Sequence, residues 1–253
     1  MKVARKSISL QSSKRNTNRQ YMANILTSSI GKKLIMSISG LFLILFLLLH
    51  VSINLFSVID LFTGSYGSPD GLFQLGCDFM SLPIVTVMVP VLALGFLVHI
   101  IYGCYLTWTN LKARGGYFRY EVSSKAKTDS WASRNMIVLG IIILGFIAFH
   151  LTHFWAHMQL QELTGGEAVN PYALLDMTFG TWWIAILYII WFGALWFHLT
   201  HGFWSAFQTV GLNNNIWLKR LKVIAYIFAT LIFLGFASVT VAVCIHNYFP
   251  TLF

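Results

Sequence analysis

The sequence predicts an all-helical integral membrane protein with five transmembrane helices. Of its 253 residues, 57% are hydrophobic and only 10% are charged, and the mean hydropathy is +0.70. A water-soluble domain could not bury this much apolar surface, so the chain is expected to use lipid as its solvent. Apolar stretches near or above the length that crosses a bilayer, about 20 residues, occur at 34–59, 82–111, 135–160, 178–210 and 223–249.

The charged residues predict how these helices are oriented. All 17 Lys and Arg residues fall on one side of the predicted spans, in the segments 2–33, 112–134 and 219–222. On the opposite side lie the acidic residues Asp60, Asp70, Asp78, Glu162, Glu167 and Asp176. By the positive-inside rule the basic side is cytoplasmic, and an odd number of spans then places the C-terminus outside.

Residues 1–30 are accordingly expected to form a cytoplasmic tail, and residues 31–253 the transmembrane domain. The tail is polar and basic, with no apolar core of a cleaved signal before the first span. Topology alone accounts for the net charge of +9, so no nucleic-acid partner is predicted.

Histidines within the apolar spans are the candidate functional residues, because ionisable side chains in a membrane are costly and mark function. Four of them follow an internal repeat in which the first and third spans share one pattern and the second and fourth share another. In each span a glycine accompanies the histidine: Gly40 with His50, Gly140 with His150, His99 with Gly103, and His198 with Gly202. The first four helices therefore look like a two-helix unit used twice, with two equivalent sites.

Depth sorts the same histidines into two layers. At a rise of about 1.5 Å per residue, His50 and His150 lie toward the external side, and His99 and His198 lie toward the cytoplasm. Two layers of paired imidazoles, each drawn from two helices, are what two b-type haems with bis-histidine ligation require. A glycine near the ligand lets the macrocycle approach the backbone. These four histidines are thus the predicted iron ligands.

Three other histidines are alternative ligands. His153 and His157 share a helical face with His150, and His201 shares one with His198. Only His150 and His198 complete the repeat, so they are preferred.

The sequence lacks motifs for other redox cofactors. Cys77, Cys104 and Cys244 form no C-x-x-C pair, and there is no P-loop or G-x-G-x-x-G after a strand. Flavin and iron-sulfur clusters are therefore expected only on partner subunits.

Five short segments together resemble a known family in their order and spacing. They are SSIGKKLIMSISGLF at 28–42, FMSLP at 79–83, VHIIYGCYLTWTN at 98–110, IAFH at 147–150 and FHLTHGFWSAFQTVG at 197–211. In these segments the chain resembles the single-chain, five-helix, di-haem cytochrome b membrane anchor of succinate:quinone oxidoreductases, which include succinate dehydrogenases and fumarate reductases. The resemblance covers residues 28–248.

The resemblance implies that His99 and His198 hold a haem near the cytoplasmic face and that His50 and His150 hold one near the external face. It implies electron transfer between menaquinone and an iron-sulfur subunit, which lies on the cytoplasmic face with a flavoprotein that carries FAD. Dicarboxylate chemistry belongs to that flavoprotein, so this chain is expected to be the quinone-binding, electron-transferring subunit of the enzyme. The implied location is the bacterial cytoplasmic membrane, and a dimer of heterotrimers is one assembly that the resemblance allows.

Four further residues receive candidate roles from the resemblance. Gln74 and Asp78 lie in the segment before the second span, where some relatives handle quinol near the external haem; Asp78 is alternatively a solvated loop residue. Ser37 and Arg134 lie toward the cytoplasmic ends of their helices, where they could meet haem propionates or simply mark helix starts.

Two other functions fit parts of the pattern. A cytochrome b subunit of a hydrogenase, formate dehydrogenase or nitrate reductase would also carry bis-histidine pairs, but the repeat and the segments around His99 and His198 favour the succinate:quinone family. A histidine-lined transporter would be colourless and would pair its histidines with membrane carboxylates. None of the eight Asp and Glu residues lies in the middle of a span.

Overall fold

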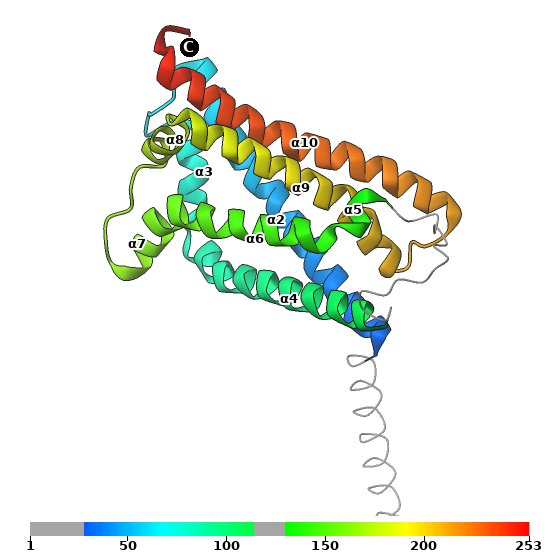
Figure 1. Cartoon of the computed structure of the whole chain (residues 1–253). Coiled ribbons are helices and arrows are strands. Elements are labelled where there is room, and N and C mark those ends of the chain that lie inside the picture. The colour runs from blue at the N-terminus through cyan, green and yellow to red at the C-terminus, as the bar shows by residue number, and fades with distance from the viewer. Residues whose placement is uncertain (1–27, 114–129, 253) are drawn as a thin grey trace, which may run out of the picture.

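The computed structural model describes residues 28–113 and 130–252; most of the predicted tail and the loop residues 114–129 lie outside this part. The described chain is helical and contains no strand. Five of its helices are long and apolar enough to cross a membrane, as predicted. They are α2 (Ser29–Thr63), α4 (Pro83–Ala113), α6 (Met136–His153), α9 (Trp182–Thr209) and α10 (Asn215–Tyr248) (Figure 1).

Short helices gather at one end of the bundle. These are α3 (Leu72–Met80), α7 (Gln159–Thr164) and α8 (Pro171–Phe179), at the end where α10 finishes (Figure 1). We call this the acidic end, because the acidic residues of the described chain belong to it. The opposite end, which we call the basic end, carries the start of α2, the end of α4, the short helix α5 (Trp131–Arg134) and the α9–α10 turn. Among the residues that the structure describes, the charge separation predicted from the sequence is kept in the fold.

Two helix termini show how local sequence defines the long helices. The Ser28 side chain caps α2 by accepting from the N–H of Gly31 at 3.0 Å, and the Asn214 side chain caps α10 by accepting from the N–H of Trp217 at 2.8 Å. Such caps satisfy N–H groups that have no partner within the helix. The α2 helix ends at Gly64, whose φ of 73° is a left-handed conformation that favours glycine.

The third span runs over Met136–His157, close to the predicted 135–160, but its regular α-helix ends early. The sequence predicts an apolar stretch to residue 160, whereas α6 ends at His153 and is followed by a 3-10 turn, Trp155–His157, and then by α7. The N–H of Val169 donates to the carbonyl of His157 at 3.0 Å and ties the following loop to this turn. The break places the polar residues Gln159, Gln161 and Glu162 at the acidic end, where burying them in hydrocarbon is avoided.

A buried carboxylate fixes α3 to the end of α2. Asp60 is 0% exposed, and its oxygens accept from the N–H groups of Leu72 and Phe73 at 2.9 and 2.8 Å. The Tyr172 hydroxyl of α8 also donates to it, at 2.6 Å. Burial, with this hydrogen bond, raises the pKa of Tyr172, so its hydroxyl stays protonated as the donor. The sequence predicts only that Asp60 lies on the external side; its anchoring role emerges from the fold.

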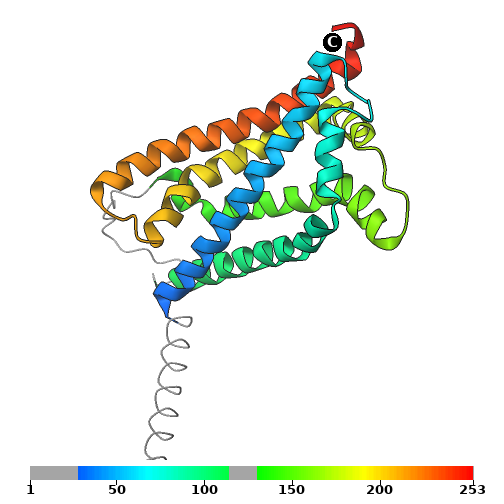
Figure 2. The same ribbon diagram turned by 180° about the vertical axis from the view of Figure 1, so that it is seen from behind.

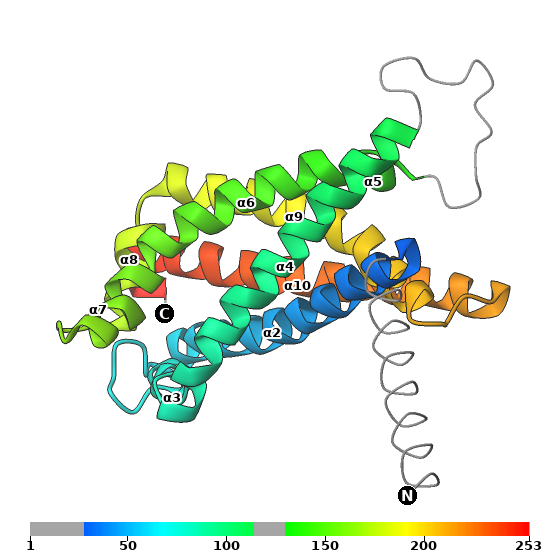
Figure 3. The ribbon, with the colours of Figure 1, turned by 90° about the horizontal axis from the view of Figure 1, so that it is seen from below.

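Four of the spanning helices form a ring of neighbours. α2 contacts α4 and α9, α9 contacts α6, and α6 contacts α4; α10 packs against α2 and α9 from outside the ring (Figures 2 and 3). α2 and α6 are therefore diagonal partners, as are α4 and α9. The buried apolar core lies mainly where α2, α9 and α10 meet, whereas α4 buries none of its residues and α6 buries only Leu139.

Candidate cofactor site: two histidine pairs on the bundle diagonals

Two pairs of histidine rings face each other across the bundle. The rings of His50 on α2 and His150 on α6 have centroids 5.8 Å apart and planes at 82°. The rings of His99 on α4 and His198 on α9 have centroids 6.3 Å apart and planes at 69°. Each pair joins two diagonal helices. The structure thus brings together the four histidines of the repeat, and their binding of iron stays a prediction.

The ring separations leave room for one metal ion within each pair. A metal–imidazole bond is about 2.0 Å long, so two rings that bind one metal from opposite sides have centroids roughly 6 Å apart. The Nδ1 atoms of His150 and His198 are buried without a hydrogen-bond partner in the described chain, which is unfavourable for a polar atom. No group of three or more His, Cys, Asp or Glu residues within 28–113 and 130–252 could hold a metal alone. Each pair thus offers two imidazoles and, among the described residues, no third ligand.

The two pairs lie at different levels of the bundle. His150 is in the last turn of α6, at the acidic end, whereas His99 and His198 lie past the midpoints of their helices toward the basic end. We call them the acidic-end pair and the basic-end pair. Gly40 lies beside the His99 ring and precedes His50 by ten residues, which is about 15 Å along the helix. The glycine–histidine spacing on α2 therefore spans the distance between the two levels.

Aromatic side chains surround the acidic-end pair. Phe46 stacks on His50 with ring centroids 5.4 Å apart. Phe146 and Phe154 lie 5.7 and 5.1 Å from the His150 ring. These apolar rings lie beside the pair and present surfaces that suit a flat, apolar ligand.

The alternative histidines make other contacts. His153 Nδ1 lies 3.1 Å from the Tyr188 hydroxyl, and the two rings are stacked at 15°. His201, whose Nδ1 is also buried and unpartnered in the part of the chain described, packs edge-on against Trp204 at 4.8 Å. His157 is exposed in the 3-10 turn. These contacts favour His150 and His198 as the paired rings.

The other predicted site residues lie near the two ends. Ser37 is buried in the half of α2 nearer the basic end, and Arg134 is the exposed last residue of α5. Gln74 and Asp78 lie one turn apart on α3, where the Gln74 amide donates to Asp78 Oδ1 at 2.8 Å. Asp78 lies in a short helix rather than in a loop, and its side chain is exposed, as the alternative of a solvated residue expects.

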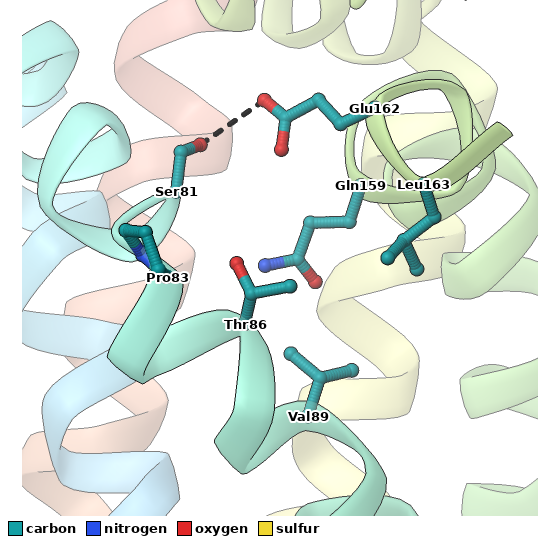
Figure 4. A pocket seen from close by; sticks show the side chains of 7 residues that line it. All are labelled: Ser81, Pro83, Thr86, Val89, Gln159, Glu162 and Leu163. Atoms are coloured by element: carbon teal, nitrogen blue, oxygen red, sulfur yellow. Dashed lines mark hydrogen bonds between the residues drawn. The ribbon is translucent and has the colours of Figure 1, made fainter. Parts of the chain in front are cut away.

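A cavity of about 360 Å³ opens between the first turn of α4 and α7 at the acidic end (Figure 4). The Ser81 hydroxyl donates to Glu162 Oε1 across it at 3.1 Å. Gln159 and Thr86 line the space between the two helices, together with the apolar Leu163 (Figure 4). The sequence does not predict this cavity, because hydropathy extends the third span through residue 160; the signal for it is the polar run that begins at Gln159.

Comparison with protein families, with curated proteins and with solved structures gave no match to this chain. The fold and the site together define a class of protein: a helical bundle with five membrane-length helices and one histidine pair on each of its two diagonals.

Proposed function

We propose that the chain is a di-haem cytochrome b subunit that anchors a succinate:quinone oxidoreductase in the membrane and passes electrons between its iron-sulfur subunit and menaquinone. The observation that carries the proposal is the pairing of four histidines across the two diagonals, at ring separations of 5.8 and 6.3 Å. A porphyrin occupies four positions around its iron, so two imidazoles complete the coordination. Bound haem supplies reversible one-electron transfer. The resemblance of the five sequence segments supports the choice of enzyme.

Packing supports flat cofactors between these helices. α4 buries none of its residues and α6 only Leu139, whereas α9 and α10 bury many. A macrocycle on each diagonal would cover the inward faces of α4 and α6. Phe46 and Phe154 would pack around the one held by the acidic-end pair and keep water away from it.

The proposed orientation places the basic end in the cytoplasm, following the positive-inside rule. The iron-sulfur and flavoprotein subunits then lie at this end, on the side of the basic-end pair. Quinone is handled at the opposite end, on the side of the acidic-end pair. The His99–His198 pair then lies toward the iron-sulfur subunit, and the His50–His150 pair lies toward the quinone.

The cavity between α4 and α7 is the proposed site for the quinone headgroup. Its volume of about 360 Å³ lies within the range of about 300–1,000 Å³ that is usual for ligand pockets. Ser81 and Gln159 offer hydrogen-bond partners to quinone oxygens, and the Glu162 carboxylate can accept a proton from a quinol hydroxyl. Gln74 and Asp78, on the neighbouring α3, already hydrogen-bond to each other. We therefore prefer the cavity to these two residues as the quinone site.

Co-purification tests the assignment of the enzyme. The chain, tagged at its C-terminus and isolated from membranes, should bring with it a polypeptide that retains flavin after denaturation. Succinate should reduce the b-type haem of the complex, which the absorbance spectrum would show. A partner that contains molybdenum or nickel would assign the chain to another respiratory enzyme. A colourless preparation would contradict haem binding altogether.

A further inference from the structure

A serine and a glycine of α2 form a seat for the His99 ring. Ser39 is 8% exposed, and its Oγ lies 3.4 Å from His99 Nδ1. A Cβ placed on the next residue, Gly40, would lie 3.2 Å from Cε1 and 3.4 Å from Nδ1 of the same ring, tighter than most Cβ contacts. The ring therefore rests against the backbone of α2, in space that glycine leaves open.

The hydrogen bond of Ser39 to its own helix favours one tautomer of the His99 ring. The Ser39 hydroxyl donates to the carbonyl oxygen of Met36 at 2.9 Å, so its lone pairs are left to face His99. With the Ser39 oxygen as an acceptor, the tautomer that carries its proton on Nδ1 of His99 is favoured. Nε2 is then unprotonated and able to bind a metal.

The second half of the internal repeat lacks this arrangement. Gly140 corresponds to Gly40, so the counterpart of Ser39 is Leu139, an apolar residue that is 4% exposed. His198, the partner of His99, has a buried Nδ1 without a hydrogen-bond partner in the described chain. The two rings of the basic-end pair therefore differ in their surroundings, although the repeat relates them.

We propose that Ser39 is a positioning residue that fixes the tautomer of His99 and lowers the reduction potential of the haem at the basic-end pair. The inference rests on the proposed function, since it requires a haem between His99 and His198. A hydrogen bond from Nδ1–H to an acceptor makes the ligating Nε2 more basic. A more basic ligand stabilises ferric over ferrous iron, which lowers the potential.

Redox titration of the haem absorbance in the purified complex tests the role of the hydroxyl. Ser39→Ala should raise the midpoint potential of the haem at the basic-end pair and leave the other haem unchanged. Ser39→Thr keeps the hydroxyl and should keep both potentials near wild type. Ser57→Ala is the matched control, because Ser57 is buried on the same helix and its hydroxyl donates to the carbonyl three residues earlier, Asn54, at 2.7 Å. This control should also leave both potentials unchanged.

Unchanged potentials in Ser39→Ala would overturn the inference while the proposed function stands. The same conclusion would follow if Ser39→Thr shifted the potential as much as Ser39→Ala, or if Ser57→Ala shifted it too. Should Ser39→Ala lose the haem, restoration by Ser39→Thr would support the seat, and failure of that variant to restore it would contradict the role of the hydroxyl. A wild-type complex without haem would refute the proposed function itself.

Discussion

The four paired histidines lie one on each of α2, α4, α6 and α9, so each ring can be removed without changing the helix of its partner. Both rings of a pair are needed to hold an iron from its two sides. A single substitution should therefore affect one level of the bundle and spare the other.

Replacing one histidine of a pair with alanine should lower the haem content from two per chain to one. His99→Ala and His198→Ala should remove the same component of the reduced-minus-oxidised spectrum, and His50→Ala and His150→Ala should remove the other. Haem content and low-temperature spectra of the purified variants provide the measurement.

His153→Ala and His201→Ala are the matched controls, because these rings contact Tyr188 and Trp204 rather than the paired histidines. Both variants should retain two haems. If His153→Ala abolished a haem that His150→Ala retained, the choice of ligand would be wrong.

Some residues of the site are predictable from the sequence because the repeat marks them. The spacing of Gly40 and His50 recurs at Gly140 and His150, and the structure pairs the histidines accordingly. Ser39 is not part of this repeat. The sequence alone does not show which neighbouring helix a serine side chain within a helix contacts. Only the packing of α4 against α2 reveals that it meets a histidine.

At the scale of helices, close approach depends on small residues. Gly235 of α10 lies against α2, and a Cβ added to it would lie 2.6 Å from Val51 Cγ2. A Cβ added to Gly145 of α6 would meet no atom within 4 Å, apart from its chain neighbours and the backbone of its own helix. Comparing substitutions at the two glycines therefore distinguishes a loss of close helix packing from the general effect of glycine on helix stability.

Gly235→Ala should destabilise the protein, because overpacking costs about 1–3 kcal/mol and outweighs the gain in helix propensity of about 1 kcal/mol. Gly145→Ala should be neutral or stabilising for the second reason alone. Thermal unfolding in detergent measures both. Equal midpoints for the two variants would show that α2 and α10 do not approach each other this closely.

The cavity between α4 and α7 makes a prediction about quinone chemistry. Glu162→Gln preserves an oxygen that can accept from Ser81 but removes the proton acceptor, so succinate:menaquinone turnover should fall about tenfold or more. Reduction of haem by succinate should persist. The control is Glu167→Gln, which changes an exposed carboxylate at the same end outside the cavity lining. A loss in Asp78→Asn but not in Glu162→Gln would place the site on α3 instead.

Hydropathy predicts the long helices but not the short ones between them. α3 depends on the carboxylate of Asp60 at its first turn, and that carboxylate also binds Tyr172 of α8. Asp60 and Tyr172 are 112 residues apart in the sequence, so no local pattern predicts their contact. Hydropathy also does not predict that α6 ends at His153, because the residues just beyond it are still apolar or aromatic.

At the scale of the whole molecule, the basic and acidic ends give the bundle a direction in the membrane. A reporter fused after the last residue should be external, and one inserted in the loop 112–134 should be cytoplasmic. Activity of an alkaline phosphatase or fluorescent fusion in each position makes the measurement. The reverse result would place the acidic-end pair, and the proposed quinone cavity, on the cytoplasmic side.

The central claim is that each diagonal of the bundle holds one haem, and haem stoichiometry tests it most directly. A pyridine haemochrome assay on the purified wild-type chain, combined with a protein determination, should give two non-covalently bound b haems per chain. A preparation that contains none, from cells that make haem and with the helical fold intact by circular dichroism, would contradict the account.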